Sequence, residues 1–191
     1  LQPAPAAEPR RTVLPRAQLA DAIQNVLLHK QYYVTGDLTS SIYADDCFFD
    51  APAPDMPVRG VVRYTDALSG LFDPETSRIE LLSFEAVDGG FAARWRLEGH
   101  LQLPWRPPIK PFTGRTLYEL DDERLICRHT EEWSISAVDA FVSVFWPDFG
   151  CAAAPPAAEL REASIEYVTL RGVSSVPELG HGTSARSVCD S

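Results

Sequence analysis

The chain has 191 residues, of which 45% are hydrophobic and 23% charged, and its formal net charge is -10 at pH 7. These values are typical of one folded domain with tails, since a single core takes ~100 to 150 residues. The negative charge argues against nucleic acid as a partner, because phosphate binding requires clustered Lys and Arg, and no run reaches the ~18 apolar residues of a membrane span.

The first part of the chain predicts an extension followed by helices. Residues 1–14 are rich in Ala and Pro and form the expected N-terminal extension. Apolar residues at helical spacing predict a helix over 16–30 and a short second helix over 38–44. A strand is expected at 47–50, and three prolines within 51–57 predict a loop.

A third helix is expected between Gly60 and the stop signal Asp73-Pro74, with Tyr64 and Leu68 in its buried stripe. From Ser77 the apolar period changes from helical to alternating, which predicts an antiparallel sheet. Its four long strands are expected at 79–87, 91–103, 112–120 and 125–133. The first two are joined by a turn at 88–90 that requires positive φ.

The strand expected at 91–103 alternates most clearly, with Phe91, Trp95 and Leu97 on one face and Arg94 and Arg96 on the other. One face therefore belongs to the core. After it, residues 138–146 fit either a short closing helix or a final strand. Residues 15–149 make up the expected domain, and 150–191 a largely irregular C-terminal extension with a helical piece at 157–167.

Four segments carry a resemblance to a known superfamily. They are residues 42–50 (IYADDCFFD), 58–60 (VRG), 114–119 (GRTLYE) and 125–133 (LICRHTEEW). In these segments and in its element order, the chain resembles the nuclear-transport-factor-2-like (SnoaL-like) superfamily over about residues 19–145. The run at 103–107 (LPWRP) resembles a plant and algal branch whose members mostly lack an assigned activity.

The resemblance implies an α+β fold in the shape of a cone, with three N-terminal helices packed on a curved four- to five-stranded antiparallel sheet. The pocket of such a cone lies between the helices and the concave face of the sheet. An acid near the end of the last strand often serves as a general base in the superfamily's enzymes, and Glu131 stands there. Ser134 stands where many relatives have Asp. The fold itself supplies no reaction, since it hosts isomerases, dehydratases, hydrolases, binders and assembly subunits.

Candidate catalytic residues are His129, Glu131 and Asp50, on condition that the pocket is open. Period-2 geometry puts His129 and Glu131 on one face, where a buried Glu could act as a base and His129 could share its proton. The alternatives are a solvated or arginine-paired strand edge for the pair, and an ordinary turn before Pro52 for Asp50. The expected pocket-lining residues are aromatic: Tyr43, Tyr64, Trp95, Tyr118 and Trp133.

No cofactor or metal is expected. The sequence has no GxSxG, P-loop, GxGxxG or HExxH motif, and its four cysteines show no zinc-type spacing. An enzyme here would work by acid/base chemistry on a small, mostly apolar molecule.

Two functions of different classes follow. The favoured one is a non-catalytic accessory or assembly subunit of a larger organellar complex, which uses the sheet face and the two extensions to contact other proteins. The alternative is an isomerase, lyase or binding protein for a small hydrophobic molecule, with its acid/base pocket at Glu131 and His129. A homodimer is a further possible assembly, although recovery of the protein only as a monomer or homodimer would count against the subunit function. The branch resemblance and the Ala/Pro/Arg-rich start favour a plastid after removal of a transit peptide, ahead of a mitochondrion.

Overall fold

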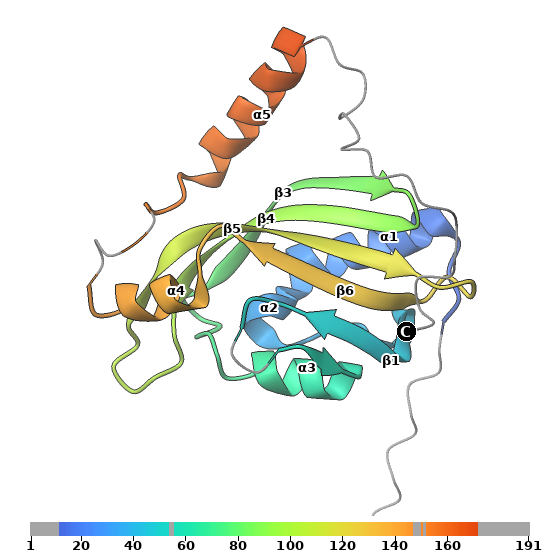
Figure 1. Ribbon diagram of the computed structural model, residues 1–191, viewed down its shortest axis with the longest axis horizontal. Coiled ribbons are helices and arrows are strands. Elements are labelled where there is room, and N and C mark those ends of the chain that lie inside the picture. Colours follow the sequence, from blue (N-terminus) through green and yellow to red (C-terminus); the bar gives the residue numbers. More distant parts are fainter. Residues whose placement is uncertain (1–11, 54–55, 147–149, 151, 172–191) are drawn as a thin grey trace, which may run out of the picture.

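The computed structural model describes residues 12–53, 56–146, 150 and 152–171. At its centre is a six-stranded sheet in the order β2-β1-β6-β5-β4-β3 (Figure 1). The strands are β1 (Tyr43–Asp50), β2 (Val58–Arg59), β3 (Arg78–Val87), β4 (Gly90–His100), β5 (Pro108–Leu120) and β6 (Ile126–Trp133). Neighbouring strands pair antiparallel, except that β1 runs parallel to β6. The fold is α+β with a mostly antiparallel sheet, as predicted, and β1 and the short β2 bring the strand count to six.

Helices precede, interrupt and follow the sheet. They are α1 (Arg16–Asn25), its π-helical continuation η1 (Val26–Lys30), α2 (Tyr32–Thr35), the 3-10 turn η2 (Ser40–Ile42), α3 (Val61–Leu68), α4 (Ala137–Ser143) and α5 (Ala157–Arg171). Among the described residues, no helix is both long enough and apolar enough to cross a membrane. In Figure 1, α5 rises from the β3 side of the sheet, and Arg161 near its start donates a hydrogen bond to the Leu81 carbonyl of β3.

The second helix predicted at 38–44 is wrong in position. Gln31 and Gly36 adopt left-handed conformations, with φ of 55° and 72°, and they confine α2 to the single turn between them. Tyr43 already belongs to β1. Helical spacing in so short an apolar segment does not distinguish a helix from a buried strand, which explains the error.

Several element ends also differ from the prediction. α3 stops at Leu68 and does not reach residue 72, and Gly70 follows with φ 92°. β4 ends at His100, just after the positive φ of Gly99, and β5 begins at Pro108. Residues 137–143 form a helix, which decides between the two alternatives for 138–146. The turn at 88–90 has the expected positive φ at Gly89.

The predicted core face of β4 is confirmed, because Phe91, Trp95 and Leu97 are buried against the N-terminal helices. Arg96, on the opposite face, is buried as well. It is covered by the C-terminal extension: Arg96 Nε donates to the Pro155 carbonyl at 2.7 Å, and Ala157 is buried at the start of α5. Both faces of the sheet are therefore covered near β4. Residues 1–11 of the N-terminal extension predicted at 1–14 lie outside the described residues.

Candidate functional site

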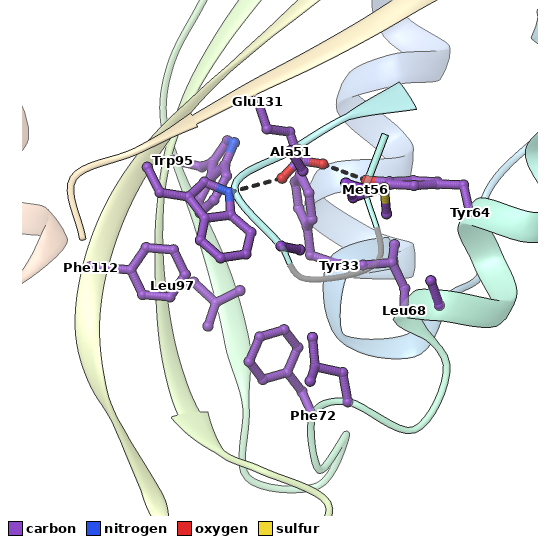
Figure 2. Close-up of a pocket in the computed structure, with 14 residues that line it drawn as sticks. Tyr33, Ala51, Met56, Tyr64, Leu68, Phe72, Trp95, Leu97, Phe112 and Glu131 are labelled. Atoms are coloured by element: carbon purple, nitrogen blue, oxygen red, sulfur yellow. Dashed lines mark hydrogen bonds between the residues drawn. The ribbon is translucent and has the colours of Figure 1, made fainter. Parts of the chain in front are cut away.

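A cavity of about 170 Å³ lies between the sheet, α3 and the loop that follows β1. Six aromatic rings contribute to its wall, with aliphatic side chains and one carboxylate between them (Figure 2). The lining residues are Tyr33, Ala51, Ala53, Met56, Tyr64, Ala67, Leu68, Leu71, Phe72, Trp95, Leu97, Phe112, Glu131 and Trp133. Glu131 is the one charged side chain among these described lining residues. A mostly apolar cavity with a few polar groups is the usual form of a small-molecule site.

Strand register brings the polar residues together. On β6, His129 pairs with Tyr118 of β5, and two residues later Glu131 pairs with Thr116. The parallel pairing of β1 puts Phe49 on the other side of His129. Because side chains alternate along a strand, all of these residues point toward the helices. The pairing of His129 and Glu131 on one inner face, predicted from their spacing, is thus realised by the sheet.

Two donors hold the carboxylate of Glu131. Tyr64, from α3, donates its hydroxyl to Oε1 at 2.6 Å, and the Trp133 indole donates Nε1–H to Oε2 at 2.9 Å (Figure 2). Glu131 is only 5% exposed. A carboxylate has about four acceptor positions, so each oxygen keeps capacity for a further donor.

His129 lies behind Glu131 and does not line the cavity. Its Nε2 atom is 3.3 Å from Oε1 of Glu131 and 3.4 Å from the hydroxyls of Tyr32 and Tyr64. Its Nδ1 atom has no hydrogen-bond partner within the described structure. His129 is fully buried, and no arginine in the described part of the chain forms an ion pair with Glu131, so the pair is neither a solvated strand edge nor an arginine-paired one. His129 therefore contacts the carboxylate of Glu131 without lining the cavity.

Five buried tyrosines surround this pair. Burial raises the pKa of each hydroxyl above its ordinary value, and for Tyr64 the charge of Glu131 raises the pKa further. They are Tyr32, Tyr33, Tyr43, Tyr64 and Tyr118. At neutral pH these hydroxyls are protonated, so they act as hydrogen-bonding groups and not as bases.

The structure brings some of the predicted site residues to the cavity and places others elsewhere. Glu131 lines it, as do Tyr64, Trp95 and Trp133. Tyr43 and Tyr118 instead pack against the ring of His129, at centroid distances of 6.3 and 5.0 Å. Asp50 is registered beside Thr130, on the face of β6 opposite to Glu131, and does not line the cavity.

The sequence analysis did not identify Tyr32 and Tyr33, which lie between the first two helices that it predicts. Tyr33 lines the cavity, and its hydroxyl is hydrogen-bonded to that of Thr116. Tyr32 reaches the hydroxyl of Tyr118 at 3.2 Å. The adjacent pair of tyrosines after an amphipathic helix was the available signal. The direction of these two side chains depends on α2, and the sequence predicted this helix in the wrong place.

No group of three or more His, Cys, Asp or Glu side chains within the described ranges is arranged to hold a metal ion. The donors nearest the cavity are one carboxylate, one imidazole and several phenols, which together offer too few anionic ligands for a structural metal.

Comparison with known proteins identifies one family and one fold. A family model described as "Uncharacterized conserved protein (DUF2358)" matches residues 21–129, which is more than half of the chain. No curated protein sequence matches the chain.

Among solved structures, AclR from Streptomyces galilaeus, described as a proposed hydroxylase, is 12% identical with a TM-score of 0.50. The match covers 83% of this chain and 97% of AclR. A SnoaL-like polyketide cyclase from Jannaschia sp. CCS1 is 13% identical (TM-score 0.49, covering 78% and 100%). An epoxide hydrolase from M. tuberculosis is 14% identical (TM-score 0.46, covering 72% and 96%). At these identities the likeness to AclR shows a shared fold alone. The expected nuclear-transport-factor-2-like (SnoaL-like) fold is confirmed, and the plant and algal branch stays a prediction.

Proposed function

Because the chain belongs to the family of uncharacterized conserved proteins (DUF2358), whose description states no activity, we propose its function from the site itself. The protein binds a small, mostly apolar molecule in the cavity, and Glu131 accepts a hydrogen bond or a proton from that molecule. The observation that carries this proposal is the position of Glu131, the one charged group in the wall of an otherwise apolar and aromatic cavity.

The volume supports a small ligand. An engineered apolar cavity of ~150 Å³ takes up a molecule the size of benzene, and the cavity here is about 170 Å³. The sequence left open whether bulky side chains fill the cone. Trp95 and Trp133 stand in the wall and leave this space between them and α3. A ligand of about six to ten non-hydrogen atoms therefore suits the space.

The hydrogen bonds of the wall favour binding with proton acceptance over a complete isomerase reaction. An isomerase that forms an enolate needs a donor aimed at the developing oxyanion. Tyr64, whose hydroxyl is at the cavity wall, donates to Glu131 instead. Tyr118 is hydrogen-bonded to Tyr32. The cavity thus offers an acceptor, and the wall donors are engaged within the protein.

Ligand-observed NMR with phenol as the probe tests the proposal. Phenol has an apolar ring and one hydroxyl donor, and we expect it to bind the native chain. Glu131→Gln removes the charge that strengthens the hydrogen bond, which is worth roughly 1.5–3 kcal/mol. We expect its dissociation constant to rise about tenfold or more.

A cavity-filling variant provides the second part of the phenol-binding experiment. Ala53→Phe adds a ring from the lining loop and should abolish phenol binding, whereas Ala152→Phe adds the same ring at an exposed position outside the cavity. Equal binding by both variants, or no binding of phenol to the native chain at millimolar concentration, would reject the proposal.

The accessory-subunit role is the second candidate. It is supported by the large exposed apolar side chains Val138, Phe145 and Trp146, on and just after α4. A plastid location belongs to the same proposal. Native mass spectrometry of the protein isolated from its source tests it, and recovery as a monomer at native concentration would count against it.

A further inference from the structure

The wall of the cavity has an unusual combination of groups. It contains six aromatic side chains and one carboxylate, and no Lys, Arg or His among the described lining residues. The aromatic residues are Tyr33, Tyr64, Phe72, Trp95, Phe112 and Trp133. Rings present negative faces that attract cations, and a carboxylate attracts them directly. Both kinds of group therefore favour a positively charged ligand.

Three of the four polar side-chain donors in the described wall, those of Tyr64, Trp95 and Trp133, are already engaged. Trp133 and Tyr64 donate to Glu131, and the Trp95 indole donates to the Thr116 hydroxyl at 2.8 Å. The Tyr33 hydroxyl is bonded to the same threonine. A ligand with only acceptor groups would leave its own polar atoms without partners here, at a cost in free energy. The ligand is expected to bring the donor.

The charges around Glu131 favour a cationic donor over a neutral one. His129 is the one basic side chain in the described structure within ion-pair distance of the Glu131 carboxylate, at 3.3 Å, and it is shared with two tyrosine hydroxyls. No described Lys or Arg forms an ion pair with Glu131. Burying a carboxylate without a Lys or Arg beside it costs free energy, and a cation that enters the cavity relieves this cost.

The rings near the carboxylate contact one another and form a continuous aromatic wall on which such a cation can lie. The centroids of Phe112 and Trp133 are 5.3 Å apart, and those of Trp95 and Phe112 are 5.8 Å apart in an edge arrangement. Cations are bound within about 6 Å of a ring centroid. Trp133 also holds Oε2 of Glu131, so the aromatic wall and the carboxylate meet at one end of the cavity (Figure 2).

We propose that the ligand is a small organic ammonium ion with apolar substituents, its nitrogen at Glu131 and its hydrocarbon part among the rings. This inference rests on the proposed binding function and adds the ligand class. The cavity of about 170 Å³ limits the ion to a cyclic or branched amine of modest size.

The test compares two probes of equal shape by isothermal titration calorimetry at neutral pH. Cyclohexylamine is protonated under these conditions, and cyclohexanol is a neutral donor of the same size. We expect the native chain to bind the ammonium ion at least tenfold more tightly than the alcohol. Glu131→Gln should remove most of that preference, with folding of the variant checked by its unfolding transition.

A second variant keeps the test independent of Glu131. Phe112→Leu retains an apolar side chain and loses the aromatic face, so it should weaken cyclohexylamine several-fold more than cyclohexanol. If the alcohol binds as tightly as the amine, and Ala53→Phe abolishes both, the ammonium assignment is wrong and the binding function stands. If neither probe binds the native chain but phenol does, the ammonium assignment is wrong and the binding function stands; if phenol does not bind either, both proposals fail.

Discussion

At the scale of single residues, the site contains hydrogen bonds to a charged acceptor and hydrogen bonds between neutral groups. The Tyr64 hydroxyl donates to a carboxylate at 2.6 Å, whereas the hydroxyls of Tyr118 and Tyr32 bond to one another at 3.2 Å. Tyr64 and Tyr118 are both fully buried. Hydrogen bonds to charged groups contribute roughly twice as much as neutral ones. The two positions therefore form a pair of buried tyrosines that differ chiefly in the charge of the hydrogen-bond partner.

We predict that Tyr64→Phe lowers the free energy of unfolding by about 1.5–3 kcal/mol, and Tyr118→Phe by about 0.5–1.5 kcal/mol. Both changes delete one buried hydroxyl and keep the ring. Urea unfolding at neutral pH measures the difference. Equal losses would show that the charge of Glu131 does not strengthen the contact with Tyr64.

The five buried tyrosines also predict a limit of stability in alkali. Their folded-state pKa values are raised above the ordinary value of 10.0, chiefly by burial. The folded chain then holds these protons more tightly than the unfolded chain does. The resulting stability is complete below pH ~10 and is lost as the pH rises above it, because the unfolded state ionises first.

We therefore expect the unfolding free energy to fall above pH ~10, and the tyrosinate absorbance of these five residues to develop together with unfolding. Parallel absorbance and circular dichroism titrations measure this. Ionisation of all five near pH 10 while the fold persists would contradict the burial of the cluster.

At the scale of elements, β5 has a glycine where β4 has its largest side chain. Gly114 is registered opposite Trp95 and Trp133 in the neighbouring strands. A Cβ atom at residue 114 would lie 2.4 Å from the Trp95 ring, closer than contact allows. The absence of a side chain at Gly114 lets the indole lie flat across β5 and form part of the cavity wall.

Gly114→Ala should accordingly destabilise the fold by about 1–3 kcal/mol through overpacking, and should also weaken phenol binding by displacing Trp95. Gly89→Asn is the control, because residue 89 has open space around it and asparagine tolerates its φ of 72°. Thermal unfolding and ligand-observed NMR measure the two effects. Unchanged stability and binding in Gly114→Ala would show that Trp95 can move without cost.

At the scale of the whole molecule, the C-terminal extension completes the face of the sheet that the N-terminal helices leave open. Arg161 of α5 donates to the carbonyl of Leu81, on the edge strand β3, at 2.6 Å, and Ala154 N donates to Pro111 O at 2.7 Å. Arg96 also pairs with Glu80 and Glu98 on this face.

These ion pairs affect the titration of Glu98. Burial alone would raise the pKa of Glu98, but the hydrogen bond and charge of Arg96 lower this pKa overall.

We predict that Arg161→Ala releases α5 while leaving the cavity intact, since the two lie on opposite faces of the sheet. Amide hydrogen exchange in α5 should accelerate and global stability should fall by only about 0.5–1 kcal/mol, because the contact is exposed. Phenol affinity should not change. The exposed neighbour Glu162 provides the control variant Glu162→Ala. Faster exchange in β6, or equal effects of both variants, would refute this division between the two faces.

The sequence by itself determined the order of the long strands, the core face of β4, and the placement of His129 and Glu131 on one face of β6. These features follow from local periodicity, because side chains alternate between the two faces of a strand whichever strand pairs with it. The resemblance to the superfamily was also carried by short contiguous segments, and it gave the fold correctly.

Only the tertiary structure decided which polar groups meet. The parallel pairing of β1 with β6 turned Asp50 away from the cavity, and the left-handed residues Gln31 and Gly36 placed Tyr32 and Tyr33 beneath the sheet. One of the two donors to Glu131, Tyr64, comes from α3, 67 residues earlier in the chain. Such contacts depend on register and on turn conformation, whose effects on side-chain direction accumulate along the chain and cannot be read from any local pattern.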